Sequence, residues 1–243
     1  MASCSSNGSA MVGCACGCSG CQPHLVSEWT PEEKAIFSSL TSIPKIQDFV
    51  DALKYEAKPD GAWSPRMTIR WGHGHCFGGS LFAAAALRNL GHRPYMVHIS
   101  TDPEVDDDHV ICAYQIDGYW GAIAKSNYST LRGRDPVYQS IRELAMSYFD
   151  FYFSSAKVKS MTGYSDPVAL EQFDERGPGK QGWMYAEDNM EDLDRVLCYE
   201  APHYNVVTSK MAPHLSPATK QLLEASTLFT NWDGLFKPKE SQT

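Results

Sequence analysis

A cysteine at the start of an apolar helix restricts the fold of this chain more than any other feature. The segment runs Gly72-His-Gly-His-Cys76-Phe-Gly-Gly-Ser-Leu-Phe-Ala-Ala-Ala-Ala-Leu and ends at Gly91, a residue typical of helix C-termini. Glycines before the cysteine permit a sharp turn and a close approach of the backbone to a bound ligand. Almost every residue between Cys76 and Arg88 is apolar, so we expect a buried central helix with the thiol at its positive end.

This position predicts a reactive thiol. The free N–H groups and the dipole at a helix N-terminus stabilise the thiolate, which is the nucleophilic form. A thiol nucleophile needs a base, and His109 follows on a strand-like segment. The alternative for a lone cysteine is a small buried hydrophobe, and this is our interpretation of Cys112 and Cys198, which lie in apolar strand-like runs. We therefore expect Cys76 to act as nucleophile and His109 as base.

The segments around this helix predict an α+β fold. A helix is expected to start at Thr30-Pro31-Glu32-Glu33, because these residues combine a capping box with a proline at the first helical position. Further helices are predicted over 44–55, 136–153 and 219–227, and a loop over 59–74. Strands are predicted over 94–99, 110–116, 119–124, 192–199 and 204–209, with a hairpin turn at Asp117-Gly118. Helices followed by an antiparallel sheet are typical of the α+β class.

A catalytic histidine also needs a third group that fixes its orientation. The polar cluster Lys125-Ser126-Asn127 follows the strand predicted over 119–124, so Asn127 or Ser126 is expected to return to the His109 ring. An oxyanion hole would use the backbone N–H of Cys76 and a second donor. The Trp71 indole and the His75 ring are the candidates for that donor.

The stretch from Trp71 to Asn127 resembles the transglutaminase-like superfamily, a part of the wider group of papain-like cysteine enzymes. The matching motifs are Gly-His-Cys76 opening an Ala/Leu-rich helix, Arg88-Asn-Leu-Gly-His-Arg-Pro94, Asp108-His109-Val and the Asp117-Gly-Tyr-Trp120 hairpin. The resemblance implies a core in which the cysteine helix packs on an antiparallel sheet. It also implies a cysteine nucleophile, a histidine base and an orienting aspartate. No aspartate stands at the third position here, and Asn127 would be a papain-style replacement.

The reaction expected from this resemblance is attack on an amide or related acyl carbon to give a thioester. Hydrolysis of a small-molecule or peptide amide is the first expectation, because no feature of the sequence identifies an amine-acceptor site. Acyl transfer to an amine and a catalytically inactive binding module are the alternatives. No cofactor is expected. A zinc site of Cys76 with His73, His75 and His109 is a further alternative, but the helix start explains the cysteine without a metal.

Composition and charge restrict the domain organisation, the partners and the location that we expect. The hydrophobic content of 43% and charged content of 21% over 243 residues are typical of a globular protein, and we expect one domain over 23–243. Residues 1–22 consist mostly of Ser, Gly, Ala and Cys and contain five of the eight cysteines, a composition that predicts a disordered tail. The alternative is that this tail binds a soft metal ion or carries a lipid. The net charge of −8 argues against a nucleic-acid partner. No run approaches the roughly 20 apolar residues of a membrane helix, no signal-peptide pattern is present, and we expect a cytoplasmic protein.

Overall fold

An antiparallel sheet forms the centre of the computed structural model, which describes residues 28–55, 61–177, 180, 182–228 and 230–235. The strands follow the order β6-β5-β4-β3-β7-β9, and β8 also pairs with β3. Their bounds are β3 Tyr95–Thr101, β4 His109–Ile116, β5 Tyr119–Ile123, β6 Arg134–Tyr138, β7 Met161–Ser165, β8 Val168–Ala169 and β9 His203–Asn205. A separate parallel pair joins β1 (Lys54–Tyr55) to β2 (His73–Gly74). The predicted α+β class with an antiparallel sheet is therefore confirmed. The tail predicted over 1–22 lies outside the described residues.

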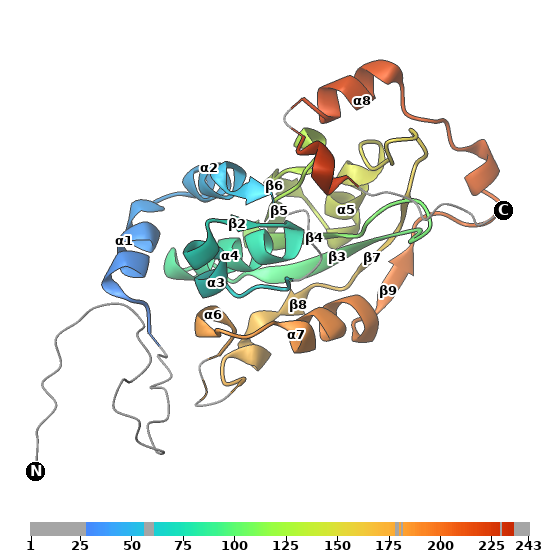
Figure 1. The fold of residues 1–243 in the computed structure, drawn as a ribbon. Coiled ribbons are helices and arrows are strands. Elements are labelled where there is room, and N and C mark those ends of the chain that lie inside the picture. The colour runs from blue at the N-terminus through green and yellow to red at the C-terminus, as the bar shows by residue number, and fades with distance from the viewer. Residues whose placement is uncertain (1–27, 56–60, 178–179, 181, 229, 236–243) are drawn as a thin grey trace, which may run out of the picture.

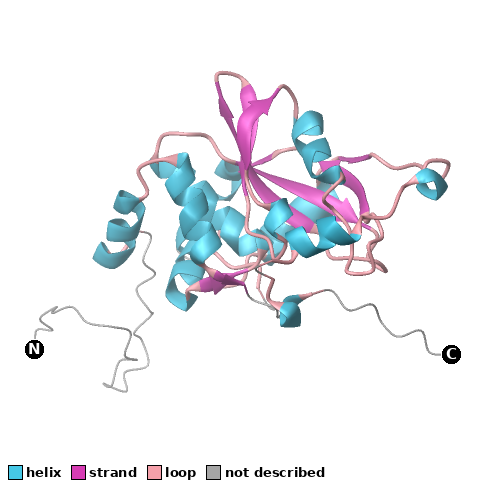
Figure 2. Ribbon diagram, turned by 90° about the horizontal axis from the view of Figure 1, so that it is seen from above, coloured by secondary structure: helices cyan, strands magenta, loops and turns pink. Residues whose placement is uncertain are grey.

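Helices cover both faces of the sheet (Figure 1). The central helix is α4 (Cys76–Asn89), whose residues from Phe77 to Leu87 are all buried. The other helices are α1 Pro31–Ser39, α2 Ile43–Ala52, α3 Pro65–Trp71, α5 Ile141–Phe149, α6 Gly182–Tyr185, α7 Glu191–Arg195 and α8 Lys220–Ser226. Both faces carry helices, and the view from above shows that more of them lie on one face than on the other (Figure 2). No helix within the described part of the chain has the length and apolar character needed to cross a bilayer.

The side chains of β4 divide between two cores, as period-2 alternation requires. Val110, Cys112 and Tyr114 pack in the core that contains α4. Ile111 and Ala113 pack in the opposite core, which contains α5. Cys112 is fully buried, as its apolar context predicted. The sheet thus separates the helix that carries Cys76 from the helix on its other face.

The hairpin from β4 to β5 forms as predicted. Asp117 and Gly118 have φ values of 50° and 85°, which are the left-handed conformations that a tight two-residue turn needs. Ile116 pairs with Tyr119 directly across the turn. The capping box at the start of α1 is also confirmed, because Thr30 and Glu33 exchange hydrogen bonds between side chain and backbone N–H. The helix predicted over 219–227 is present as α8.

Two predictions near the site were wrong in extent or type. The helix predicted over 136–153 begins only at Ile141, where the Ser140 hydroxyl accepts a hydrogen bond from the N–H of Glu143. The residues before it form the edge strand β6, a position that tolerates Pro136. The segment predicted as a loop over 59–74 contains α3, because Ser64 caps a helix that starts at Pro65.

The C-terminal strands were also predicted poorly. Residues 192–199 are helical, with α7 followed by a π-helix over Val196–Glu200. Leu193 and Leu197 lie four residues apart and are both fully buried, so the apolar residues follow a helical and not a strand period. Cys198 lies half-buried in this π-helix. Of the strand predicted over 204–209, the structure contains the short β9.

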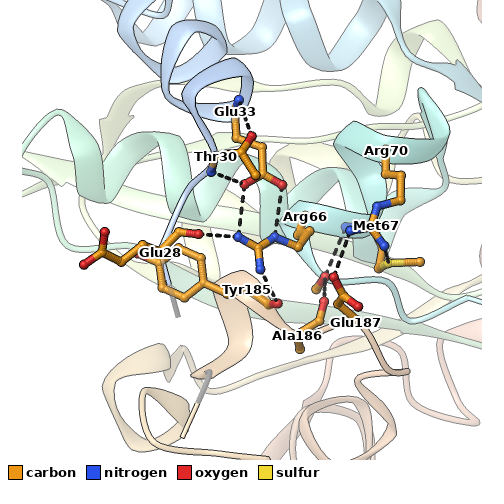
Figure 3. A network of polar contacts seen from close by, with 10 residues as sticks. Glu28, Thr30, Glu33, Arg66, Met67, Arg70, Tyr185, Ala186 and Glu187 are labelled. Carbon is orange, nitrogen blue, oxygen red and sulfur yellow. Dashed lines mark hydrogen bonds and ion pairs between the residues drawn. The ribbon is translucent and has the colours of Figure 1, made fainter. Parts of the chain in front are cut away.

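A buried ion pair joins α1 to α3, the helix that precedes the cysteine (Figure 3). Arg66 is 1% exposed, and its Nε and Nη2 each donate to a carboxylate oxygen of Glu33 at 3.0 Å. Its Nη1 donates to the carbonyl of Tyr185 at 3.1 Å, and Nη2 also contacts the carbonyl of Glu28. Glu33 therefore caps α1 and pairs with Arg66 at the same time, which fixes α3 against the N-terminal part of the fold.

Candidate active site

The structure places Cys76 as the first residue of α4. Its approach is a turn at Gly72, which ends α3 with a φ of 67°. His75 caps the helix, because its Nδ1 accepts a hydrogen bond from the N–H of Phe77 at 3.2 Å. The Sγ atom of Cys76 lies 3.8 Å from that same Nδ1. The thiol is therefore at the helix N-terminus, where the helix dipole favours a thiolate.

Small residues after the cysteine hold α4 close to its neighbours. A Cβ atom on Gly79 would lie 2.5 Å from the Cβ of Lys125, and one on Gly78 would lie 3.1 Å from Oγ1 of Thr68. The Ser80 hydroxyl donates to the carbonyl of Val110 at 2.9 Å. Since Val110 directly follows His109, this bond ties the first turns of α4 to the start of β4. The glycines inside the helix thus serve helix–strand packing.

His109 is the first residue of β4 and is 3% exposed. Its Nε2 lies 3.0 Å from the carbonyl oxygen of Leu131. A carbonyl can only accept, so Nε2 carries a proton and the neutral ring has an unprotonated Nδ1. The rings of Tyr148 and Tyr152 pack edge-on against the imidazole, with centroids 6.1 and 6.3 Å away. A main-chain carbonyl and two tyrosines therefore set the tautomer and orientation of this ring.

Cys76 and His109 line one small cavity of about 40 Å³. The rest of the lining comes from β1, the acidic loop, the segment after β5, the segment after α5 and the C-terminal turn: Tyr55, Asp106, Asp107, Asp108, Ser126, Asn127, Tyr128, Leu131, Tyr152 and Gly234. A second recess of about 450 Å³ shares Tyr55, Ser126 and Asn127 with this cavity. The space beside the thiol is close to the volume of one water molecule.

The expected hydrogen bond from His109 to Asn127 or Ser126 is replaced by the bond to Leu131. Both polar atoms of the Asn127 amide bond to the main chain of Asn231 instead, each at 2.9 Å. Ser126 accepts a hydrogen bond from the N–H of Tyr128 at 3.0 Å. Both residues line the cavity, as their place in the sequence predicted. The acceptor was missed because a backbone carbonyl has no signature in the sequence.

The two candidates for a second oxyanion donor lie on either side of the turn that leads to Cys76. Trp71 lies at the end of α3 with 56% of its surface exposed, and its ring packs on Trp63 at 5.9 Å. It does not line the cavity. His75 uses Nδ1 as an acceptor in the helix cap, so the donor of its neutral ring is Nε2. Within the described ranges, no group of three or more His, Cys, Asp or Glu side chains is arranged to hold a metal ion, the set proposed for zinc included.

The acidic loop contributes carboxyl groups whose pKa values are shifted in different directions. Burial raises the pKa of Asp106 to about 6, although hydrogen bonds from Ser160 and from the N–H of Asp107 oppose the shift. Burial and the charge of Asp108 raise the pKa of Asp107. Burial acts in the same direction on Asp108, but hydrogen bonds from His98 and Thr101 bring its pKa below the ordinary value. The carboxylate next to His109 is therefore held by partners outside the cavity.

The cavity disfavours uncompensated negative charge. Burial raises the pKa of Tyr55, and the nearby Cys76 thiol adds to the shift. Burial likewise raises the pKa of Tyr152 well above its ordinary value. A thiolate formed here would need a nearby cation, and an imidazolium at His109 has the right sign.

The sequence placed Lys125 after the predicted strand but did not predict that its side chain is buried and bonded to main-chain carbonyls. Its Nζ donates to the carbonyl of Asp51 at 3.0 Å and to that of Leu53, beneath the second recess. Burial lowers its pKa to about 8. Alternation along the preceding strand could have indicated that this lysine points inward, but its partners are distant in the chain.

A scan against protein-family models finds no match for the chain, and a comparison with curated proteins finds no similar sequence. The geometry of the cavity is accordingly the basis for the functional interpretation.

Proposed function

We propose that this chain is a cysteine-dependent hydrolase with a transglutaminase-like core, acting on a peptide or small-molecule amide or a related acyl bond. Cys76 is the nucleophile and His109 the base. One observation carries the proposal: a thiol at a helix N-terminus shares a cavity with an imidazole whose Nδ1 is free of its proton. Nucleophilic catalysis by a thiol needs a base within hydrogen-bond reach, and the shared cavity brings the two side chains to one place where Nδ1 can approach the thiol.

The reaction would begin with transfer of the thiol proton from Cys76 to Nδ1 of His109. The Nε2–H bond to Leu131 holds the resulting imidazolium in place. The thiolate attacks the acyl carbon, and the N–H of Cys76 at the helix start stabilises the oxyanion. His109 then returns the proton to the leaving amine as the thioester forms. Water, deprotonated by the same nitrogen, cleaves the thioester and restores the thiol.

A carbonyl acceptor supports orientation without adding a negative charge. Asp and Asn side chains do this in related chemistry, but the requirement is only an acceptor that fixes the Nε2–H tautomer. We expect the imidazolium here to be stabilised less than it would be by an aspartate, since the Leu131 carbonyl is a dipole and not an ion.

His75 is the competing base, because its Nδ1 lies 3.8 Å from the Sγ atom of Cys76. Its lone pair already accepts the N–H of Phe77. Protonating Nδ1 would break the helix cap and place a positive charge at the positive end of α4, and both effects are unfavourable. The geometry therefore favours His109.

The test is the rate of alkylation of Cys76 by iodoacetamide as a function of pH, followed by mass spectrometry of the Cys76 peptide. Three proteins are compared: wild type, His109→Gln and His75→Asn. Glutamine can keep a donor toward Leu131, and asparagine is a good helix cap, so both variants are chosen to preserve the fold. We expect His109→Gln to slow alkylation at pH 7 about tenfold or more and His75→Asn to change it by less than about threefold.

Equal rates in wild type and His109→Gln would refute His109 as the base. A large loss in His75→Asn alone would transfer that role to the capping histidine. A slow wild-type thiol that no variant alters would support the binding-module alternative. With a reactive thiol established, amide and ester libraries with and without an added amine would separate hydrolysis from acyl transfer.

A further inference from the structure

The C-terminal segment 230–235 contacts the wall of the candidate active site; its red helical turn, Trp232–Gly234, lies in front of the centre of the fold in Figure 1. The Asn127 side chain donates from Nδ2 to the carbonyl of Asn231 and accepts the N–H of the same residue at Oδ1, each at 2.9 Å. The Thr230 hydroxyl donates to the carbonyl of Asn127 at 2.9 Å. Asn127 is 8% exposed beneath this contact. The segment is therefore held by specific bonds to a residue of the cavity wall.

The two hydrogen bonds made by the side-chain amide of Asn127 go to the main chain of Asn231 and not to its side chain. One side-chain amide satisfies both the N–H and the C=O of a single residue, in the way that a neighbouring strand would. Any residue other than proline can supply this pair of groups. The indole of Trp232 is 63% exposed, so the next side chain in the segment is largely directed away from the protein. The contact is a site for a peptide backbone.

The same segment narrows the cavity at the thiol. Gly234 lines the cavity together with Cys76 and His109. A Cβ atom at this position would lie 3.1 Å from the Tyr55 ring and 3.2 Å from Nδ2 of Asn127, which is tighter than ordinary contact. With the segment in place, the cavity that Cys76, His109 and Gly234 line together has a volume of about 40 Å³, close to that of one water molecule. Cys76 itself is half-buried, so a small reagent can reach the thiol, whereas we expect a larger substrate to need the segment to move.

We propose that residues 230–235 occupy the substrate site as an internal peptide, and that the substrate of this protein is a peptide bound through its main chain at Asn127. This inference rests on the function proposed above and specifies its substrate class. A glycine or another small residue of the substrate takes the position of Gly234 beside the thiol. The tethered segment competes with the substrate at an effective concentration on the order of millimolar, and thus restrains the enzyme.

The adjoining recess gives a peptide room to continue. It is lined by Tyr55, Lys125, Asn127 and Asn231 among others and has a volume of about 450 Å³. Because it shares Tyr55 and Asn127 with the cavity of Cys76, a chain bound at Asn127 can extend from the recess to the thiol. The site is therefore elongated, as a peptide substrate requires.

The experiment measures binding of a fluorescein-labelled peptide, Thr-Asn-Trp-Asp-Gly-Leu, by anisotropy to the full chain. The receptor variants are wild type, Asn231→Pro and the double variant Asn127→Ala/Asn231→Pro. Asn231 has a φ of −77°, which proline can adopt, while its N–H bond to Asn127 is removed. We expect the peptide to bind Asn231→Pro at least tenfold more tightly than wild type, and the added Asn127→Ala to reverse most of this gain.

A matched ligand control is the same peptide with an N-methyl group on its asparagine, which removes only the N–H that Asn127 accepts. It should bind Asn231→Pro at least tenfold more weakly than the parent peptide. Gly234→Val provides a second way to displace the segment if Asn231→Pro does not fold. Equal binding to all three receptors, no binding to either opened variant, or equal binding of the two peptides overturns the proposal.

Peptide binding and thiol chemistry can fail separately, which keeps the two proposals distinct. The anisotropy measurement needs neither Cys76 nor His109 to react. If the peptide binds as expected and His109→Gln leaves the thiol unchanged, the chain is a peptide-binding module without the proposed catalysis. If the thiol behaves as proposed and the peptide does not bind, the substrate is of another class.

Discussion

The carboxyl group of Asp106 offers a test of the electrostatics around the cavity. It is 7% exposed, accepts a hydrogen bond from the Ser160 hydroxyl at 2.7 Å and another from the N–H of Asp107 at 3.0 Å. Burial raises its pKa from 3.8 to about 6. Replacing it by asparagine keeps the shape and allows both bonds, because the amide can accept from Asp107 and donate to Ser160.

The size and sign of the effect follow from linkage. A carboxyl group whose pKa is higher in the folded state costs no stability below about pH 3.8, where both states are protonated. Between pH 3.8 and 6 the unfolded chain ionises and the folded one does not, so stability falls by about 1.4 kcal/mol per pH unit. Above pH 6 the loss is constant at about 3 kcal/mol. The asparagine side chain does not ionise, so Asp106→Asn avoids this loss. Its free energy of unfolding should exceed that of wild type by about 1 kcal/mol at pH 4.5 and by about 3 kcal/mol at pH 7.5.

The assay is urea unfolding, followed by tryptophan fluorescence, at several pH values between 4.5 and 8 for both proteins. Asp48→Asn is the control, because Asp48 is an exposed carboxylate on α2. It should change the free energy of unfolding by less than about 0.5 kcal/mol at any pH. A difference between Asp106→Asn and wild type that does not vary with pH, or that shrinks as pH rises, would refute the reasoning.

Two further predictions concern the packing that supports the site. Arg66→Leu leaves the buried carboxylate of Glu33 without a cation, with the Thr30 N–H as its remaining bond, and should lower the free energy of unfolding in urea by about 3–5 kcal/mol. Adding Glu33→Gln should restore much of this loss, and no restoration would show that the uncompensated charge is not the cause. Gly79→Ala places a Cβ atom 2.5 Å from that of Lys125 and should cost about 1–3 kcal/mol. Gly74→Ala is its control, since the nearest contact there is 3.7 Å and the change should be small; equal losses in the two variants would contradict this account.

Much of the local structure near the site was predictable from the sequence because its signals are short in range. Apolar residues after Cys76 predicted a buried helix, and that helix begins at the cysteine. Asp117-Gly118 predicted the hairpin, which has the expected left-handed turn. Errors arose where an edge strand precedes a helix, as at 136–153, and where buried leucines at helical spacing were interpreted as a strand. The first error arose at the boundary between two elements, and in the second the helical spacing of Leu193 and Leu197 was overlooked.

The sequence by itself determined that Cys76 starts a buried helix, that His109 lies on a strand of an antiparallel sheet, and that polar residues follow the paired strand. These features depend on periodicity, caps and turns within a few residues. The tertiary structure alone decided that the carbonyl of Leu131 orients His109 and that Asn127 holds the main chain of Asn231. Every residue carries a carbonyl and nearly every residue an N–H, so residue identity does not specify which of them meet across long stretches of chain.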